Sequence, residues 1–157
     1  MEKQQLTPCG VFVILFSILL GCSFQKSSVK DAETSRIDSL LSFYKDSLAV
    51  RPLAVISKLR TDQENVSDSI NYYNLDQTIS RCYYFSNRVD SAFLLNDRIL
   101  HFVEKQPEKA DRLLKLSADA YNSRGVFFQD MSQWDSAIFC LHNASEALSQ
   151  ANDFGRL

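Results

Sequence analysis

The sequence predicts an all-α fold in which pairs of antiparallel helices repeat along the chain. The 157 residues include only four Gly and three Pro, fewer turn-forming residues than a many-stranded β fold uses. From Ile37 onward, apolar residues recur at the spacing of one helical face. The tripeptide Asp-Ser-Ala occurs at 90–92 and again at 135–137, a shift of 45 residues that indicates a repeating unit.

Composition excludes several classes of protein. The chain has 17 Lys+Arg, 19 Asp+Glu and 45% hydrophobic residues, which suits one globular domain and is too apolar for a disordered protein. The net charge is -2 and no basic cluster occurs. Because neutralising phosphates requires clustered Lys and Arg, we expect no nucleic acid to bind this chain.

Residues 1–21 are predicted to form a lipoprotein signal peptide. The apolar run at 11–20 is too short to span a bilayer, which takes about 20 residues, but has the length of a secretory apolar segment. The stretch Leu19-Leu20-Gly21-Cys22 resembles a bacterial lipobox. This resemblance implies cleavage before Cys22 and acylation of Cys22 by chains such as palmitate, which would anchor the protein to a bacterial membrane, facing the periplasm or the cell exterior. The alternative is an uncleaved anchor, or an ordinary signal peptide in which Cys22 is incidental.

Residues 22–34 are expected to be the lipid anchor and a polar tether, because the segment lacks apolar periodicity. Of the four cysteines, only Cys82 and Cys140 would remain in the exported domain as unmodified thiols. Two cysteines can form one disulfide. Their expected positions in the middle of helices of different repeats favour two packed thiols instead.

Helical repeats are expected over residues 35–150. The first helix should bury one face, made of Ile37, Leu40, Leu41, Tyr44 and Leu48. A second helix should begin at Pro52, since the first helical turn needs no N–H from that residue. The same periodicity predicts later helices at about 67–86, 89–104, 108–129 and 133–150. We expect residues 151–157 to be the start of a further repeat or a truncated end.

Six positions of the last unit resemble the tetratricopeptide repeat. They follow that family's order of large, glycine, aromatic, alanine, large and alanine: Tyr121, Gly125, Phe128, Ala137, Leu141 and Ala144. The resemblance implies an α-solenoid of about three such helix pairs. The middle unit departs from the pattern, with Ser80 in place of glycine and Ile99 in place of the second alanine. The alternative is a helical bundle in which the spacing is coincidental.

The resemblance also implies a peptide-binding surface. In this family the first helix of each pair lines a concave groove that receives peptides or partner segments. The positions that correspond to this groove are Asn74, Gln77, Arg81 and Tyr84 in the middle unit, and Asp119, Asn122, Val126 and Gln129 in the last unit. The alternative is that these residues belong to an ordinary solvated helix surface.

No pattern in the sequence indicates catalysis. His101 and His142 are the only histidines, and neither has a convincing set of metal ligands at helical spacing. The chain also lacks a glycine-rich phosphate loop and a serine nucleophile elbow. We therefore expect no enzymatic activity, no cofactor and no metal.

The sequence favours a non-catalytic scaffold that binds an unknown protein or peptide and is tethered to a bacterial membrane. The alternative is a sensory input module. The chain resembles the leading segment of larger membrane-anchored bacterial proteins in which such repeats precede a transcriptional regulator or a histidine kinase. The last predicted helix carries four apolar residues that a neighbour could cover, so we expect a homo-oligomer or missing C-terminal repeats: Trp134, Ile138, Leu141 and Leu148.

Overall fold

The computed structural model describes residues 30–108 and 110–154, and the side chains only as far as Ala151. All regular secondary structure in this part of the chain is helical, which confirms the all-α class. The expected signal peptide and the lipidation site at Cys22 lie outside the described residues.

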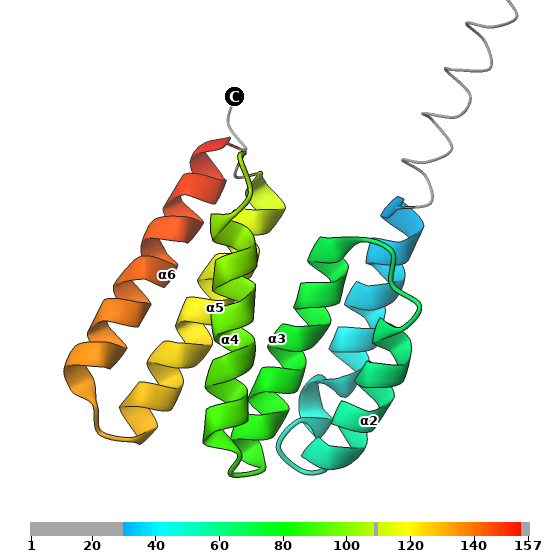
Figure 1. The fold of residues 1–157 in the computed structure, drawn as a ribbon, viewed down its shortest axis with the longest axis horizontal. Helices are drawn as coiled ribbons and strands as arrows, with labels where there is room; N and C mark the ends of the chain where they lie inside the picture. The colour runs from blue at the N-terminus through cyan, green and yellow to red at the C-terminus, as the bar shows by residue number, and fades with distance from the viewer. Residues whose placement is uncertain (1–29, 109, 155–157) are drawn as a thin grey trace, which may run out of the picture.

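The helices follow one another in antiparallel order, and the chain alternates direction from each helix to the next (Figure 1). Residues 30–44 are helical and lead into a short 3₁₀ helix, η1. The elements are η1 (Lys45–Ser47), α2 (Pro52–Gln63), α3 (Ser69–Phe85), α4 (Val89–Glu104), α5 (Asp111–Asp130) and α6 (Trp134–Phe154). Pro52 is the first residue of α2, where its missing N–H costs nothing.

Two helices extend further than the periodicity predicted. Residues 30–34 are helical where we expected the end of a polar tether, and α6 continues to Phe154 instead of ending near residue 150. Ala147 and Ala151 are both buried, so the packed face of α6 continues through this last part. Small apolar residues at i and i+4 gave too weak a pattern to predict the extension.

The turns after α3 and α5 have the same backbone geometry. Asn87 and Ser132 adopt the left-handed conformation, with φ of 59° and 60°. In both turns the next amide donates to the carbonyl five residues earlier at 2.8 Å, from Arg88 to Tyr83 and from Gln133 to Phe128. These are the bonds of a Schellman motif. Equivalent residues lie 45 positions apart, so the backbone repeats with the period of the Asp-Ser-Ala tripeptide.

Two clusters of buried side chains make up much of the core. The larger joins the helix at 30–44, α2, α3 and α4 through Ile37, Leu48, Val55, Ile56, Leu59, Leu75, Ile79, Cys82 and Leu95. The smaller joins α4 to α5 through Ile99, Val103, Leu113, Leu116 and Ala120. The thiols of Cys82 and Cys140 are buried and unpaired, which confirms the expectation of two packed thiols.

A close approach between α5 and α6 depends on Gly125. A Cβ atom at this position would lie 2.8 Å from Cγ and Cδ2 of Leu141 and 3.5 Å from the carbonyl oxygen of Ala137. Ala137 and Ala144 are buried on the facing side of α6, whereas Tyr121 and Phe128 are half-buried on another face of α5. The absence of a side chain at 125 therefore sets the distance between the two helices.

A small polar residue occupies a similar close contact between α3 and α4. Ser80 lies 45 positions before Gly125, and its hydroxyl donates to the carbonyl oxygen of Ala92 at 2.8 Å. Ser80 and Ala92 are both completely buried. Ser80 is small enough to let α3 approach α4 closely, and its hydroxyl group forms a hydrogen bond across the contact.

Glu33 fastens the first helix to the loop between α2 and α3. Its carboxylate accepts hydrogen bonds from the Ser67 hydroxyl at 2.6 Å, the Ser67 amide at 3.1 Å, the Asp68 amide at 3.0 Å and the Asn71 side chain at 3.1 Å. Desolvation raises the pKa of Glu33, but these bonds together outweigh it and lower the pKa from 4.5 to about 2. The ionised form is thus favoured in the fold.

α6 exposes a row of large apolar side chains along the edge of its contact with α5. Trp134, Ile138, Leu141 and Leu148 are 58%, 67%, 39% and 45% exposed. They recur at helical spacing, so they share one side of the helix. The expectation that another subunit or further repeats cover this side remains a prediction.

We predict that Gly125→Leu lowers the free energy of unfolding by about 1–3 kcal/mol, because the added side chain overlaps Leu141. Thermal unfolding measures the loss. Leu141→Ala provides the control, since it removes the atoms that a side chain at 125 would meet. If Gly125→Leu costs as much in the Leu141→Ala background as in the wild type, the close approach is not the cause.

We predict that Glu33→Gln lowers the free energy of unfolding by about 1 kcal/mol at pH 7. The pKa of Glu33 is lower in the fold than its ordinary value, so its stabilising effect is complete above pH 4.5 and is lost as the pH falls toward about 2. Denaturant unfolding across this range should show the two proteins converging. Glu64→Gln, at an exposed position, should change little, and an equal effect of both substitutions would contradict the role of Glu33.

Candidate functional site

The helix at 30–44 with the residues up to Leu48, α3 and α5 line a hollow of about 360 Å³. Five of the eight residues predicted for the peptide groove line it: Asn74, Gln77, Arg81, Asp119 and Asn122. A second hollow of about 390 Å³ shares Leu41, Asn74 and Asp119 with the first. The two hollows therefore form one continuous depression, which we call the inner groove.

Gln77 joins the two longer walls of the inner groove. Its side-chain amide donates to the Asp119 carbonyl at 2.9 Å and to the Ser123 hydroxyl at 2.7 Å. These bonds hold α3 against α5 at the middle of the groove. The Oε1 atom of Gln77 is buried and accepts no hydrogen bond among the described residues, so the bonds of its side-chain nitrogen are what position the walls.

Basic side chains outnumber acidic ones along the inner groove. Its lining includes four basic and two acidic residues, namely Lys45, Arg81, Arg112, Lys115, Asp38 and Asp119. Arg112 is paired with Asp68 at 3.5 Å, and Lys115 with Asp111 at 2.6 Å. Among the described residues no ion pair engages Lys45 or Arg81, so these two cations remain available to a negatively charged ligand.

Asp119 lies beside Arg81 in the inner groove. Solvent reaches its side chain, but the surrounding helices partly desolvate the carboxylate and raise its pKa above the ordinary value of 3.8. The positive charge of Arg81 limits this rise. The fold thus disfavours the ionised form of Asp119. Shifted pKa values of this kind are common among residues of binding and catalytic sites.

Three predicted groove residues lie elsewhere. Tyr84 stacks on Phe127 with 4.0 Å between ring centroids, and its hydroxyl donates to Asp130 at 2.9 Å. Desolvation and the Asp130 carboxylate raise the pKa of this phenol, so it stays protonated as a donor. Val126 and Gln129 are exposed on α5 and do not line the inner groove. The wall formed by the first helix and the described residues after it includes no lining residue beyond Leu48.

Sequence reasoning also missed several lining residues, including Asp38, Leu41, Lys45, Arg112 and Lys115. The first unit matched the repeat pattern too weakly to align its groove positions. The residues on α5 lie one to two turns before Asp119, on the face that Asp119 and Asn122 define. Arg112 and Lys115 thus lie on the predicted face when it is extended toward the beginning of α5.

The described part of the chain shows no arrangement of metal ligands. No group of three or more His, Cys, Asp or Glu side chains there could hold a metal ion, and His101 and His142 are both exposed. Within residues 30–108 and 110–154, none of the helices has the length and hydropathy needed to cross a bilayer. In comparisons with protein-family models, curated proteins and solved structures, the chain matches none of them.

We predict that Asp119→Asn raises the free energy of unfolding at pH 7 by about 0.5 kcal/mol. The pKa of Asp119 is higher in the fold than 3.8, so its charge destabilises the fold at neutral pH and has no effect below pH 3.8. Unfolding measured at pH 7 and pH 3 should show the gain only at the higher pH. Asp90→Asn, which removes an acidic residue from the first turn of α4, should have the opposite sign at pH 7. A loss of stability in Asp119→Asn would contradict this account.

Proposed function

We propose that the chain is a non-catalytic scaffold whose helices form about three tetratricopeptide-like pairs and whose inner groove binds a peptide segment of a partner protein. The matching turns after α3 and α5, 45 residues apart, support the repeat. So do Gly125 and Ser80, which occupy equivalent close contacts in the two later pairs. On this proposal the helix at 30–44 and α2 form the first pair.

The observation that carries the binding proposal is the gathering of five residues from α3 and α5 in one groove. Asn74 and Asn122 each offer an amide donor and acceptor from opposite walls, a pairing that suits the backbone of an extended peptide. Arg81 and Lys45 add positive charge without ion-pair partners among the described residues. The preferred ligand is therefore an extended segment with at least one Asp or Glu.

The proposal predicts that Arg81→Ala with Asn122→Ala weakens peptide binding about tenfold or more and leaves helicity unchanged. Both side chains are exposed and lie outside the core clusters. The full chain, purified in detergent, would be used to select binders from a display library of random 12-residue peptides. Fluorescence polarisation of the selected peptides then compares wild type and variant.

A matched control is Arg88→Ala with Gln129→Ala. It removes the same kinds of side chain from exposed positions that line neither hollow of the inner groove. The control should bind like the wild type, and the selected peptides should be enriched in Asp and Glu. If no peptide is enriched, or if both double variants lose affinity equally, the inner groove is not the binding site.

We also propose that a lipidated Cys22 tethers the scaffold to a bacterial membrane, on the side of the periplasm or the cell exterior. The support is the Leu19-Leu20-Gly21-Cys22 stretch after a short apolar run. Two or more acyl chains bury enough methylene groups for stable attachment, whereas one chain binds only marginally.

The tether predicts that Cys22→Ala abolishes incorporation of a fatty-acid analogue. The variant should also leave the membrane fraction or retain its uncleaved leader. Metabolic labelling in a bacterial host measures both, and Cys9→Ala serves as the control because Cys9 precedes the expected cleavage point. Equal labelling of wild type and Cys22→Ala would rule out this anchor.

A further inference from the structure

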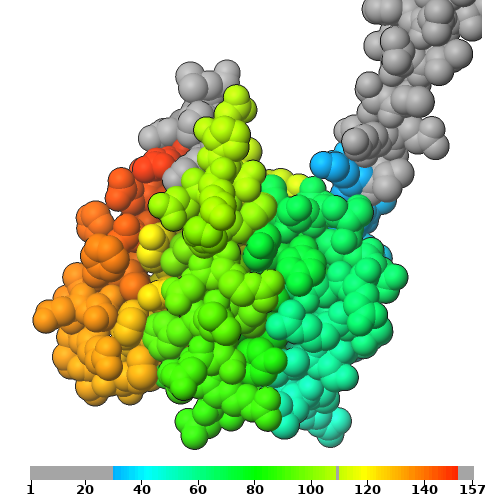
Figure 2. All heavy atoms as spheres, in the orientation of Figure 1, coloured from blue at the N-terminus to red at the C-terminus, as the bar shows by residue number. Residues whose placement is uncertain are grey.

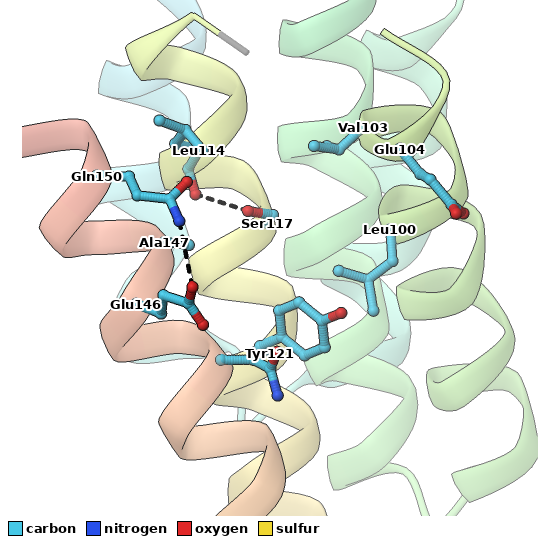
Figure 3. A pocket seen from close by; sticks show the side chains of 10 residues that line it. Leu100, Val103, Glu104, Leu114, Ser117, Tyr121, Glu146, Ala147 and Gln150 are labelled. Carbon is cyan, nitrogen blue, oxygen red and sulfur yellow. Dashed lines mark hydrogen bonds between the residues drawn. The ribbon is translucent and has the colours of Figure 1, made fainter. Parts of the chain in front are cut away.

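A second groove lies between α4 and α6, with α5 as its floor, and we call it the outer groove. Two hollows of about 400 and 560 Å³ share Leu100 and Tyr121, so the groove is continuous along α5. Figure 3 shows the first hollow, where Leu100 of α4 and Tyr121 of α5 lie across from Glu146 of α6. In Figure 2, yellow atoms of α5 are visible between the orange α6 and the green α4.

The outer groove has the length of a short helix. Its floor on α5 consists of residues at helical spacing, from Leu114 through Ser117, Tyr121 and Arg124 to Phe128. Fourteen steps of 1.5 Å give about 21 Å, or about four helical turns. α4 and α6 both pack on α5 and are not closely packed on each other, which leaves this length open. These floor residues lie on the side of α5 opposite to Asp119 and Asn122, so the two grooves are separate.

Leu114, Tyr121 and Phe128 give the floor apolar surface, and the one basic residue that lines the described groove is already engaged. Arg124 forms an ion pair with Asp97, and its guanidinium lies 5.3 Å from the Phe93 ring centroid and 5.9 Å from that of Phe128. Phe139, on the α6 side, is 65% exposed. A partner that covered these rings would bury apolar surface that now faces water.

Acidic residues occupy both rims. Asp97 and Glu104 line the α4 side, and Asp135 and Glu146 line the α6 side. With Arg124 as the sole cation, the lining carries a surplus of three negative charges. In the described residues no Lys or Arg pairs with Glu104, Asp135 or Glu146, although His101 lies 4.0 Å from Glu104. The rims thus attract positive charge on both sides of the Leu114, Tyr121 and Phe128 side chains.

We propose that the outer groove binds an amphipathic helix of a partner protein, with apolar residues on the α5 floor and Lys or Arg side chains between the acidic rims. The backbone groups of α4, α5 and α6 are bonded within their own helices, so the groove offers no edge to an extended strand. A helix satisfies its own backbone and presents side chains at i, i+3/4 and i+7, which suits a floor with the same spacing.

The test uses three fluorescent peptides of about 16 residues. The first carries Leu on one helical face and Lys on the other, the second replaces Lys with Glu, and the third keeps the first composition but scatters the Leu residues. Polarisation against the full chain should show the Leu–Lys helix binding at least about tenfold more tightly than either of the others. If the full chain binds none of them up to about 1 mM, or binds all three alike, the proposal is wrong.

Substitutions then locate the binding. Phe139→Ala should weaken binding of the Leu–Lys helix about tenfold, whereas Ile138→Ala, which removes an equally exposed side chain that does not line the groove, should leave it unchanged. Asp135→Lys with Glu146→Lys should reverse the preference toward the Leu–Glu helix. Glu64→Lys with Asp90→Lys, at exposed positions outside the groove, should not reverse it.

The two grooves can be distinguished in the same assay. Arg81→Ala with Asn122→Ala alters only the inner groove, so it should retain the Leu–Lys helix with wild-type affinity. Circular dichroism of each variant checks that the fold is intact. If the Phe139 and Ile138 substitutions have equal effects, or if charge reversal does not change the preferred peptide, the outer groove is not the site.

Discussion

The buried carboxylate of Asp76 fixes the relative positions of three helices. It is completely inaccessible to solvent, and one of its oxygens lies 2.9 Å from Nη1 of Arg60 on α2 and 3.0 Å from Nε2 of Gln63. Its other oxygen lies 3.6 Å from Nη2 of Arg98 on α4. A buried charge without partners costs several kcal/mol, so α2 and α4 must lie where both arginines reach α3. The walls of both grooves depend on this arrangement, since α3 lines one and α4 the other.

Local patterns were sufficient to predict most helices and their connections. Pro52 marks the start of α2, and apolar periodicity places α3 and α4 within two residues of their observed ends. The long-range polar contacts could not be predicted in this way. Glu33 reaches a loop more than thirty residues away, and Asp76 binds arginines on two other helices. Such pairings have no period in the sequence, and only the packed helices bring the partners together.

The candidate site was predicted in part, for a geometrical reason. Helical spacing identifies which residues share a face, so Asn74, Arg81, Asp119 and Asn122 fall together in the inner groove. Helical spacing does not indicate how far along the helix neighbouring elements enclose that face. The third wall comes from the first helix and the residues up to Leu48, and Tyr84 lies outside the groove with its ring stacked on Phe127. The repeat pattern places Tyr121 and Phe128 in the helix packing, whereas both line an open hollow, so the sequence pattern does not indicate the outer groove.

α5 lies between two grooves of opposite charge, so the side chains that line them contribute an electric dipole directed across the domain. Four basic and two acidic side chains line one side, and four acidic and one basic line the other. In the field of a charged surface or a large charged protein, such a molecule experiences a torque as well as an attraction. The charges that line the two grooves favour the orientation in which the inner groove faces a negatively charged neighbour. The surroundings of the domain thereby influence which of its two faces a diffusing molecule meets first.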